Sequence, residues 1–179
     1  MAGGESGAGR GGRPRFLVDA MCHPLVSWLR IFDYDAIGAL ELGASVPDGE
    51  LVRLSMKDGR VLVTRDNGLA EQARGQGVDV VRVEGNETEG HIRQMVQQLG
   101  VNPTPRAARC TACNGSLARV GEEEITDQIA LSVAREGRAV WCCRRCGQHY
   151  WQGTHWANIE RTAREVSRYG CTARAGKRA

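Results

Sequence analysis

Two Cys-x-x-Cys pairs in the C-terminal half constrain this chain more than any other feature. The pairs are Cys110–Cys113 and Cys143–Cys146. Two such turns supply four thiolates, which form the tetrahedral shell that zinc prefers. In a reducing compartment, this spacing favours a metal ion over disulfides. Because all four ligands are sulfur, the sequence predicts one structural zinc ion held in a zinc ribbon.

The segment between the two pairs is unusually long for a ribbon. It holds 29 residues, from Cys113 to Cys143, against about 15–20 in the usual pattern. A short helix or hairpin within it is indicated by three apolar residues at four-residue spacing, Ile125, Ile129 and Val133. Cys142 has no partner three residues further on, so we take it as a spare thiol. His149 and His155 are expected to be packed side chains rather than ligands.

Apolar strands alternate with amphipathic helices in the first half of the chain. Strands are indicated at residues 15–19, 33–37, 61–63 and 78–83. Helices are indicated at residues 24–32, 48–57, 68–74 and around the stripe Ile92, Val96 and Leu99. Residues 38–47 are expected to form a loop. This alternation predicts an α/β fold in which a parallel sheet has helices on both faces.

Proline and composition divide the chain into segments. Pro103 and Pro105 mark a linker between two halves. The expected segments are a disordered, basic, Gly-rich arm (1–14), an α/β domain (15–103), a zinc ribbon (106–156), a terminal helix (157–169) and a basic tail (170–179).

The modest net charge of +3 hides an asymmetry. Residues 16–105 hold eight basic and thirteen acidic side chains, whereas residues 106–179 hold thirteen basic and seven acidic ones. This division is expected when one half gathers cations and the other approaches a polyanion, although solvated faces of no special use explain it equally well. No segment approaches the roughly 20 apolar residues of a membrane span. We therefore expect a cytoplasmic protein without a membrane partner.

Acidic side chains follow two of the predicted strands. Asp19 ends the first strand, and Asp66 comes just after the strand at 61–63. If those strands are neighbours, both carboxylates lie in one crevice at the carboxyl edge of the sheet. Asp48 and Glu50, at the start of a helix, can close that crevice from the side. Grouped carboxylates require a cation or a proton. Oxygen ligands suit Mg²⁺ or Mn²⁺, which promote phosphodiester hydrolysis.

Each of these residues also has a purely structural interpretation. Asp48 can be a helix cap and Asp66 a turn residue. Asp19 differs from them, because burying an acid at the end of a strand costs free energy unless it has a partner. Arg65 either grips a phosphate or lies on the surface. Cys22 and the histidine after it are poorly placed to form a nucleophile pair, so we expect Cys22 to be a buried thiol.

Six motifs occur in a fixed order over residues 15–156: Phe16-Leu17-Val18-Asp19-Ala20-Met21, Trp28-Leu29-Arg30, Leu62-Val63-Thr64-Arg65-Asp66, Cys110-x-x-Cys113-Asn114-Gly115, Trp141-x-Cys143-x-x-Cys146-Gly147 and Tyr150-Trp151-x-Gly153-x-His155-Trp156. This ordered set resembles the Mut-seven C-terminal ribonuclease family, in which a PIN-like domain is fused to a zinc ribbon.

The resemblance implies a PIN-like α/β fold with an acidic, divalent-metal site and endoribonuclease activity on RNA. By that likeness, Asp19 and Asp66 are metal ligands, Asp48 is the middle acid and Glu50 is a second choice for it. The ribbon and the basic tails would then bind RNA, either free or in a ribonucleoprotein.

Two departures from the family keep alternatives open. Where the family has a Leu-Gly-basic stretch, this chain has Cys22-His23-Pro24, and Asp33 replaces a glycine. The retained acids favour a nuclease, whereas the altered stretch favours a non-cleaving module that binds RNA or a ribonucleoprotein. A third possibility is a structural zinc protein with a protein partner, because three of the four tryptophans fall within residues 141–156.

Overall fold

The structure is a computed structural model that describes the backbone of residues 12–173 and the side chains of residues 12–169. Most of the basic tail (170–179) and most of the basic arm (1–14) predicted above fall outside these ranges. Within the described residues, no helix is both long enough and apolar enough to cross a bilayer.

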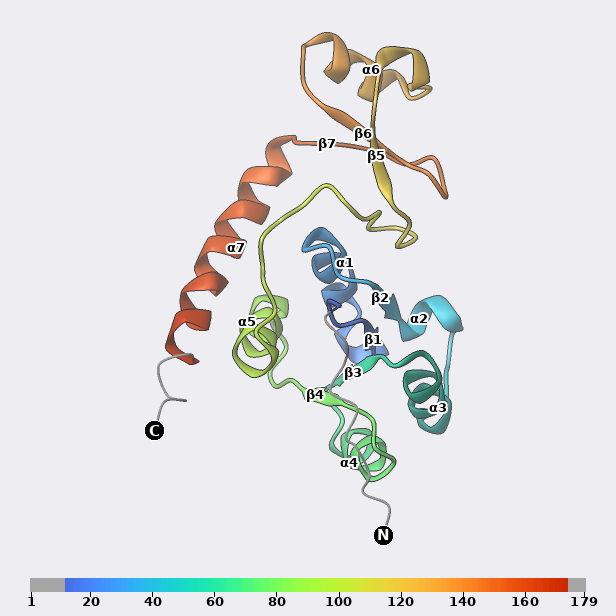
Figure 1. Cartoon of the computed structure of the whole chain (residues 1–179), viewed down its shortest axis with the longest axis vertical. Coiled ribbons are helices and arrows are strands. Elements are labelled where there is room, and N and C mark those ends of the chain that lie inside the picture. Colours follow the sequence, from blue (N-terminus) through green and yellow to red (C-terminus); the bar gives the residue numbers. More distant parts are fainter. Residues whose placement is uncertain (1–11, 174–179) are drawn as a thin grey trace.

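Four parallel strands form the first sheet, in the order β2-β1-β3-β4 (Figure 1). Their bounds are β1 Phe16–Val18, β2 Ala36–Gly38, β3 Val61–Thr64 and β4 Val80–Arg82. In the central register, Val18 pairs with Gly38 on one side and with Val63 on the other. The strands that carry Asp19 and precede Asp66 are therefore neighbours, which was the condition for the two acids to share one edge.

Helices cover both faces of this sheet, as the sequence predicts. The longer ones are α1 Pro24–Ile31, α3 Asp48–Asp58, α4 Asn67–Gly75 and α5 Thr88–Leu99. Successive residues of a strand point to opposite faces. Phe16 and Val18 pack in one buried cluster with residues of α1 and α5, whereas Leu17 packs in another with residues of α3 and α4.

Two local predictions were wrong. Residues 38–47 are not all loop, because they contain the one-turn helix α2, Ala39–Leu42, which follows β2 directly. The carboxylate of Glu41 turns back to the Gly38 N–H (3.3 Å) and also binds Arg30 (2.6 Å), and this tertiary contact stabilises a helix too short to stand alone. The sequence also favours Asn67 as the cap of the helix at 68–74, but the cap is Asp66, which accepts the N–H of Leu69, and Asn67 is the first residue of α4.

A second, antiparallel sheet forms the ribbon, in the order β5-β6-β7. Its strands are β5 Leu117–Val120, β6 Val140–Cys143 and β7 His149–Trp151. The long segment between the Cys pairs contains the 3-10 turn Glu122–Glu124 and the helix α6, Gln128–Arg135. Ala130 and Val133 of α6 face the strands, whereas Ile129 is 65% exposed.

The last helix follows the ribbon and packs against the helices of the first sheet. Helix α7, Thr154–Ala173, starts earlier and runs further than predicted. It returns alongside α5 (Figure 1), and its Ala163 and Val166 belong to the same buried cluster as Phe16. Helix α7 of the C-terminal half therefore completes the core on one face of the parallel sheet, whereas the ribbon strands and α6 keep a cluster of their own.

Arg30 connects the two halves at a second place. Its side chain, in α1, is 1% exposed. The guanidinium donates to the carbonyl oxygen of Ala36 in β2 (3.0 and 2.8 Å), to that of Thr111 (2.8 Å) and to the carboxylate of Glu41 (2.6 Å). Thr111 lies inside the first Cys-x-x-Cys turn, so one buried cation joins the edge of the parallel sheet to that turn.

Asn114 reinforces this junction. It adopts a left-handed backbone conformation (φ 64°), and its amide donates to Asp35 (2.9 Å), the residue just before β2. Arg60 donates to the same carboxylate (2.7 Å). Burial opposes ionisation of Asp35, but the hydrogen bonds from Arg60 and Asn114 outweigh it and lower the pKa of Asp35.

We expect Arg30→Met to destabilise the protein by about 3 kcal/mol, because it leaves two buried carbonyls and a carboxylate without their donor. Chemical denaturation at equilibrium measures this. Arg53→Met is the matched control, since Arg53 pairs with Glu50 on the surface of α3 and its loss should change stability little. Equal effects of the two substitutions would contradict the anchoring role of Arg30.

Candidate functional site

The four cysteines of the two pairs come together in the ribbon. Their sulfur atoms all lie within 4.8 Å of one another. The Cys110–Cys146 and Cys113–Cys143 sulfur separations are 3.6 and 3.5 Å. A tetrahedron with Zn–S bonds of about 2.3 Å has sulfur separations of about 3.8 Å, so the group can hold one metal ion such as zinc.

The protein around these sulfurs is built to accept a cation. The Tyr150 hydroxyl lies 3.1 Å from the Cys110 sulfur and 3.2 Å from the Thr111 hydroxyl. Burial opposes the thiolate at Cys110, yet hydrogen bonds, first from Tyr150, lower its pKa to about 7. Burial and the neighbouring thiols raise the pKa of Cys113 to about 12. Four thiolates are therefore compatible only with a positive ion between them.

The remaining candidates near the ribbon lie outside this group. Cys142 points its sulfur at the carbonyl oxygens of Cys143 (3.7 Å) and Gly147 (3.5 Å) and packs against the cluster under α6. His149 is buried and His155 is exposed. Residue 115 must be a glycine because the backbone passes close to the sulfurs: a Cβ at Gly115 would lie 2.9 Å from the Cys143 sulfur.

At the carboxyl edge of the parallel sheet, one hydroxyl links the two acids. The Thr64 hydroxyl donates to Asp19 (2.8 Å) and accepts the backbone N–H of Asp66 (3.0 Å). Asp19 is only 9% exposed, whereas Asp66 is open to solvent. Thr64 was not among the predicted site residues, although a hydroxyl at the last position of a buried strand, two residues before Asp66, was a usable signal.

Each of these carboxylates uses one oxygen within the protein. Asp19 binds Thr64 through Oδ2, and Asp66 caps α4 by accepting the Leu69 N–H through Oδ1 (2.7 Å). The other oxygen of each accepts no hydrogen bond from the described residues. Two carboxylate oxygens on adjacent strands therefore remain for a ligand.

The third predicted acid is not joined to this pair. Asp48 is the first residue of α3, is exposed, and has no hydrogen bond or ion pair to a described residue. Glu50 turns to Arg53 on its own helix (2.6 Å), and that contact lowers the pKa of Glu50. Over residues 12–169, the four cysteines are the one set of three or more ligating side chains close enough to share an ion.

Arg65 borders an open depression of about 530 Å³ beside Asp66. Its guanidinium donates to the Asn86 side chain (2.6 Å). Arg82 and Glu84 form an ion pair on the same rim. Charges of both signs therefore line this part of the edge.

The Cys22-His23-Pro24 segment packs rather than reacts. Cys22 is 1% exposed, and burial, followed by the nearby Asp19, raises the pKa of its thiol to about 11. The His23 ring lies over the end of β2, where a Cβ on Gly38 would come within 2.7 Å of its Nδ1. This agrees with the expectation that Cys22 is a buried thiol.

For the thiol group, we expect about one zinc ion per purified chain. Cys110→Ser and Cys146→Ser should lose the ion and unfold the ribbon, because the metal supplies folding free energy there. Cys142→Ser, which changes a sulfur outside the group, is the matched control and should retain it. Metal analysis with circular dichroism tests this, and zinc retained in Cys146→Ser but lost in Cys142→Ser would assign the ligands differently.

Comparison with known proteins agrees with the motifs. A family model described as the Mut7-C RNAse domain matches residues 14–163, which is most of the chain. No curated protein and no solved structure matches the chain. The match confirms the resemblance drawn from the ordered motifs. The matched range includes both the acid pair and the four-cysteine group. The chain belongs to the Mut7-C RNAse domain family.

Proposed function

We propose that this protein is a divalent-metal-dependent endoribonuclease that hydrolyses RNA phosphodiesters at the carboxyl edge of the parallel sheet. The observation that carries the proposal is the acid pair. Asp19 and Asp66 are linked through Thr64, and each keeps one carboxylate oxygen free. A buried carboxylate with a single hydrogen bond is costly unless a cation also approaches it.

Each residue has an assigned role in this proposal. Asp19 and Asp66 hold Mg²⁺ or Mn²⁺, which when bound activates water and stabilises charge on the phosphate. Asp48 completes the site from the start of α3, and Glu50 is less suited because Arg53 engages it. Helix α3 packs against α4, the helix that Asp66 caps. A Cβ on Gly49 of α3 would lie 3.8 Å from the amide of Gln72 in α4. Arg65 is the candidate phosphate contact.

The substrate class follows from the family and from charge. An RNAse domain acts on RNA, and residues 106–179 carry the basic surplus. Phosphate contacts by Lys and Arg make such binding salt-dependent. RNA, free or within a ribonucleoprotein, is therefore the proposed partner of the ribbon and α7, while the zinc ion is structural.

A non-cleaving RNA-binding module is the second candidate. It is favoured by one observation: over the described residues, no third carboxylate lies with Asp19 and Asp66 at ligand distance. The two candidates differ in whether the acid pair is needed for cleavage, so the same experiment decides between them.

We expect Asp19→Asn to lower RNA cleavage by about a hundredfold or more, because metal binding and transition-state stabilisation fail together. The fold should survive, since the Asn carbonyl oxygen can still accept the Thr64 hydroxyl. Asp66→Asn should behave alike, because Asn is also a good helix cap. Cleavage of a labelled RNA in Mn²⁺, beside a thermal melt and zinc analysis, measures this.

Asp79→Asn is the matched control. Asp79 is exposed at the opposite, amino-terminal end of β4, so the same charge change there should leave cleavage intact. Wild-type cleavage by a clean Asp19→Asn preparation would reject the nuclease mechanism and favour the binding module.

A further inference from the structure

The two faces of the ribbon sheet differ in character. Across the strands, Val120, Val140 and Trp151 are paired in register, and this row packs against α6. The next row, Arg119, Trp141 and Tyr150, must point to the opposite face because side chains alternate along a strand. That opposite face carries a cation, an indole and a phenol side by side.

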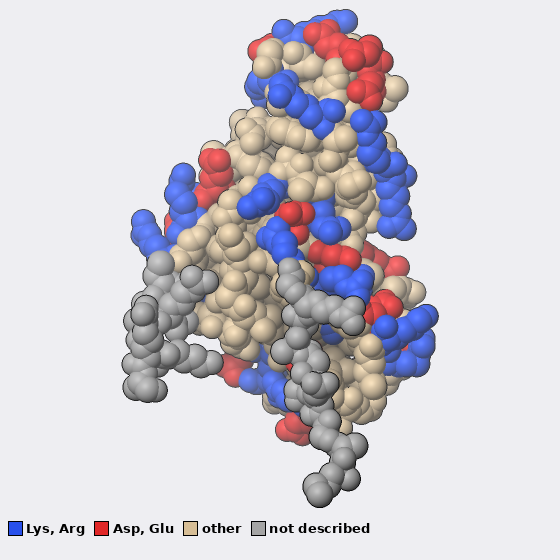
Figure 2. Space-filling model, in the orientation of Figure 1, with Lys and Arg blue, Asp and Glu red and all other residues tan. Residues whose placement is uncertain are grey.

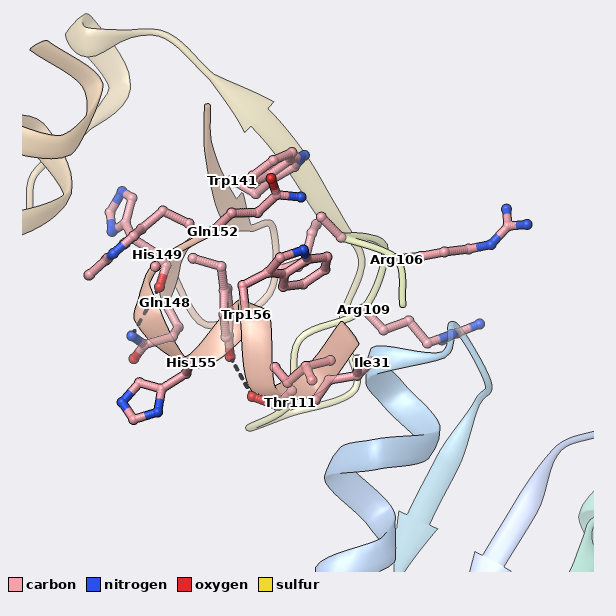
Figure 3. Close-up of a pocket in the computed structure, with 16 residues that line it drawn as sticks. Ile31, Arg106, Arg109, Thr111, Trp141, Gln148, His149, Gln152, His155 and Trp156 are labelled. Atoms are coloured by element: carbon pink, nitrogen blue, oxygen red, sulfur yellow. Dashed lines mark hydrogen bonds between the residues drawn. The ribbon is translucent and has the colours of Figure 1, made fainter. Parts of the chain in front are cut away.

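A pocket of about 420 Å³ opens on this second face. Its walls include Trp141 from β6, Trp156 from the start of α7 and Ile31 from the end of α1. Figure 3 shows the Gln152 side chain between the two indoles and the Arg106 side chain extending outward from the pocket. The volume lies within the range of small-molecule sites, and the walls include three tryptophans and Tyr150.

The polar groups around this pocket differ in whether they are already engaged. Tyr150 is committed to Cys110 and Thr111. The Trp156 N–H donates to Glu160 (2.8 Å), which fixes the orientation of that indole. The Gln152 amide makes no hydrogen bond with a described residue, so it is available to a ligand at the rim.

The arginines of the ribbon also differ in whether they have a partner. Acidic side chains gather at the tip of the ribbon (Figure 2), and three arginines there are paired: Arg135 with Glu122, Arg138 with Glu136 and Arg144 with Glu124. The side chains of Arg106 and Arg119 make no hydrogen bond or ion pair with any described residue, and both are exposed. Uncompensated positive charge therefore lies beside the aromatic pocket at Arg106 and Arg119. Arg145 adds a further unpaired cation at the cysteine group, where it donates to the carbonyl oxygen of Cys113 (3.1 Å).

We propose that this pocket binds an unpaired nucleobase of single-stranded RNA, which stacks on Trp141 beside Trp156 while Arg106 and Arg119 contact the flanking phosphates. Stacking on exposed aromatic rings is how proteins bind single strands, and it requires bases that are not paired in a helix. The Gln152 amide is placed to bind a base edge. The inference rests on the proposed function in taking RNA as the partner, and it makes the ribbon a selector for unpaired segments.

The test is a fluorescence titration of the full chain with a single-stranded RNA of about ten nucleotides, without added Mg²⁺ or Mn²⁺ and without chelator, so that zinc stays bound. Stacking should quench tryptophan emission. A duplex of the same length and an abasic strand with the same number of phosphates should bind at least tenfold more weakly, roughly the loss of one stacked base.

Paired variants separate stacking from folding. Trp141→Leu should weaken binding about tenfold, whereas Trp141→Phe, which keeps an aromatic ring, should retain most of the affinity. Arg119→Ala should reduce the salt slope by about one unit, and Arg138→Ala, whose side chain is already paired, should not. Zinc content confirms that the ribbon is intact. If Trp141→Leu loses zinc, Trp141→Phe and the two arginine variants still decide the question.

Equal affinity for the abasic strand, or unchanged binding by a zinc-loaded Trp141→Leu chain, would overturn the proposal. So would a stable dimer in sedimentation whose tryptophans RNA does not quench, because a second copy would then cover this face. Cleavage assays on the Asp19 variants are independent of these results, so failure of the base pocket is distinguishable from failure of the nuclease.

Discussion

The rest of the structure depends on one buried cation, the guanidinium of Arg30. A guanidinium removed from water is costly unless all its donors are used. Here they meet the carbonyl of Ala36 on one side and that of Thr111 on the other, with Glu41 balancing the charge. These partners belong to the parallel sheet and to the first cysteine turn. Neither half can reorganise at this point without leaving a buried polar group unpaired.

This constraint makes the ribbon part of the same structural unit as the parallel sheet. The cysteine turn is held against β2 by Arg30 and Asn114, while α7 packs on α5 within the same core. The ribbon sheet is thus connected to the parallel sheet at two separated places. Under the proposed function, an RNA strand bound to the ribbon would reach the acid pair in a set geometry, and one segment of the strand would then be favoured for cleavage.

The sequence predicts the fold where its signals are local. Alternating strands and helices predict the parallel sheet with helices on both faces, and the Cys spacing predicts the metal group. Local signals are insufficient where a tertiary contact decides. The helix α2 depends on the contact between Glu41 and Arg30, and no periodicity shows that an arginine in α1 will be buried. The sequence predicts that Asp19 and Asp66 lie at the same edge of the sheet. It does not predict that Thr64 bridges them, because that contact depends on the register of β1 and β3.

Asp33, at a position where the motif resemblance implies glycine, connects the two halves of the chain through ion pairs. Asp33 has a left-handed backbone (φ 66°), a conformation that explains why glycine suits this position and that aspartate tolerates better than most residues. A glycine would remove the strain, but it would offer no carboxylate. The Asp33 carboxylate instead pairs with Arg13 (2.7 Å) and with Arg109 (3.6 Å), the residue just before Cys110. After Arg30 and Asn114, Asp33 therefore provides a third link between the first half of the chain and the cysteine turn, and it makes no contact with Asp19 or Asp66.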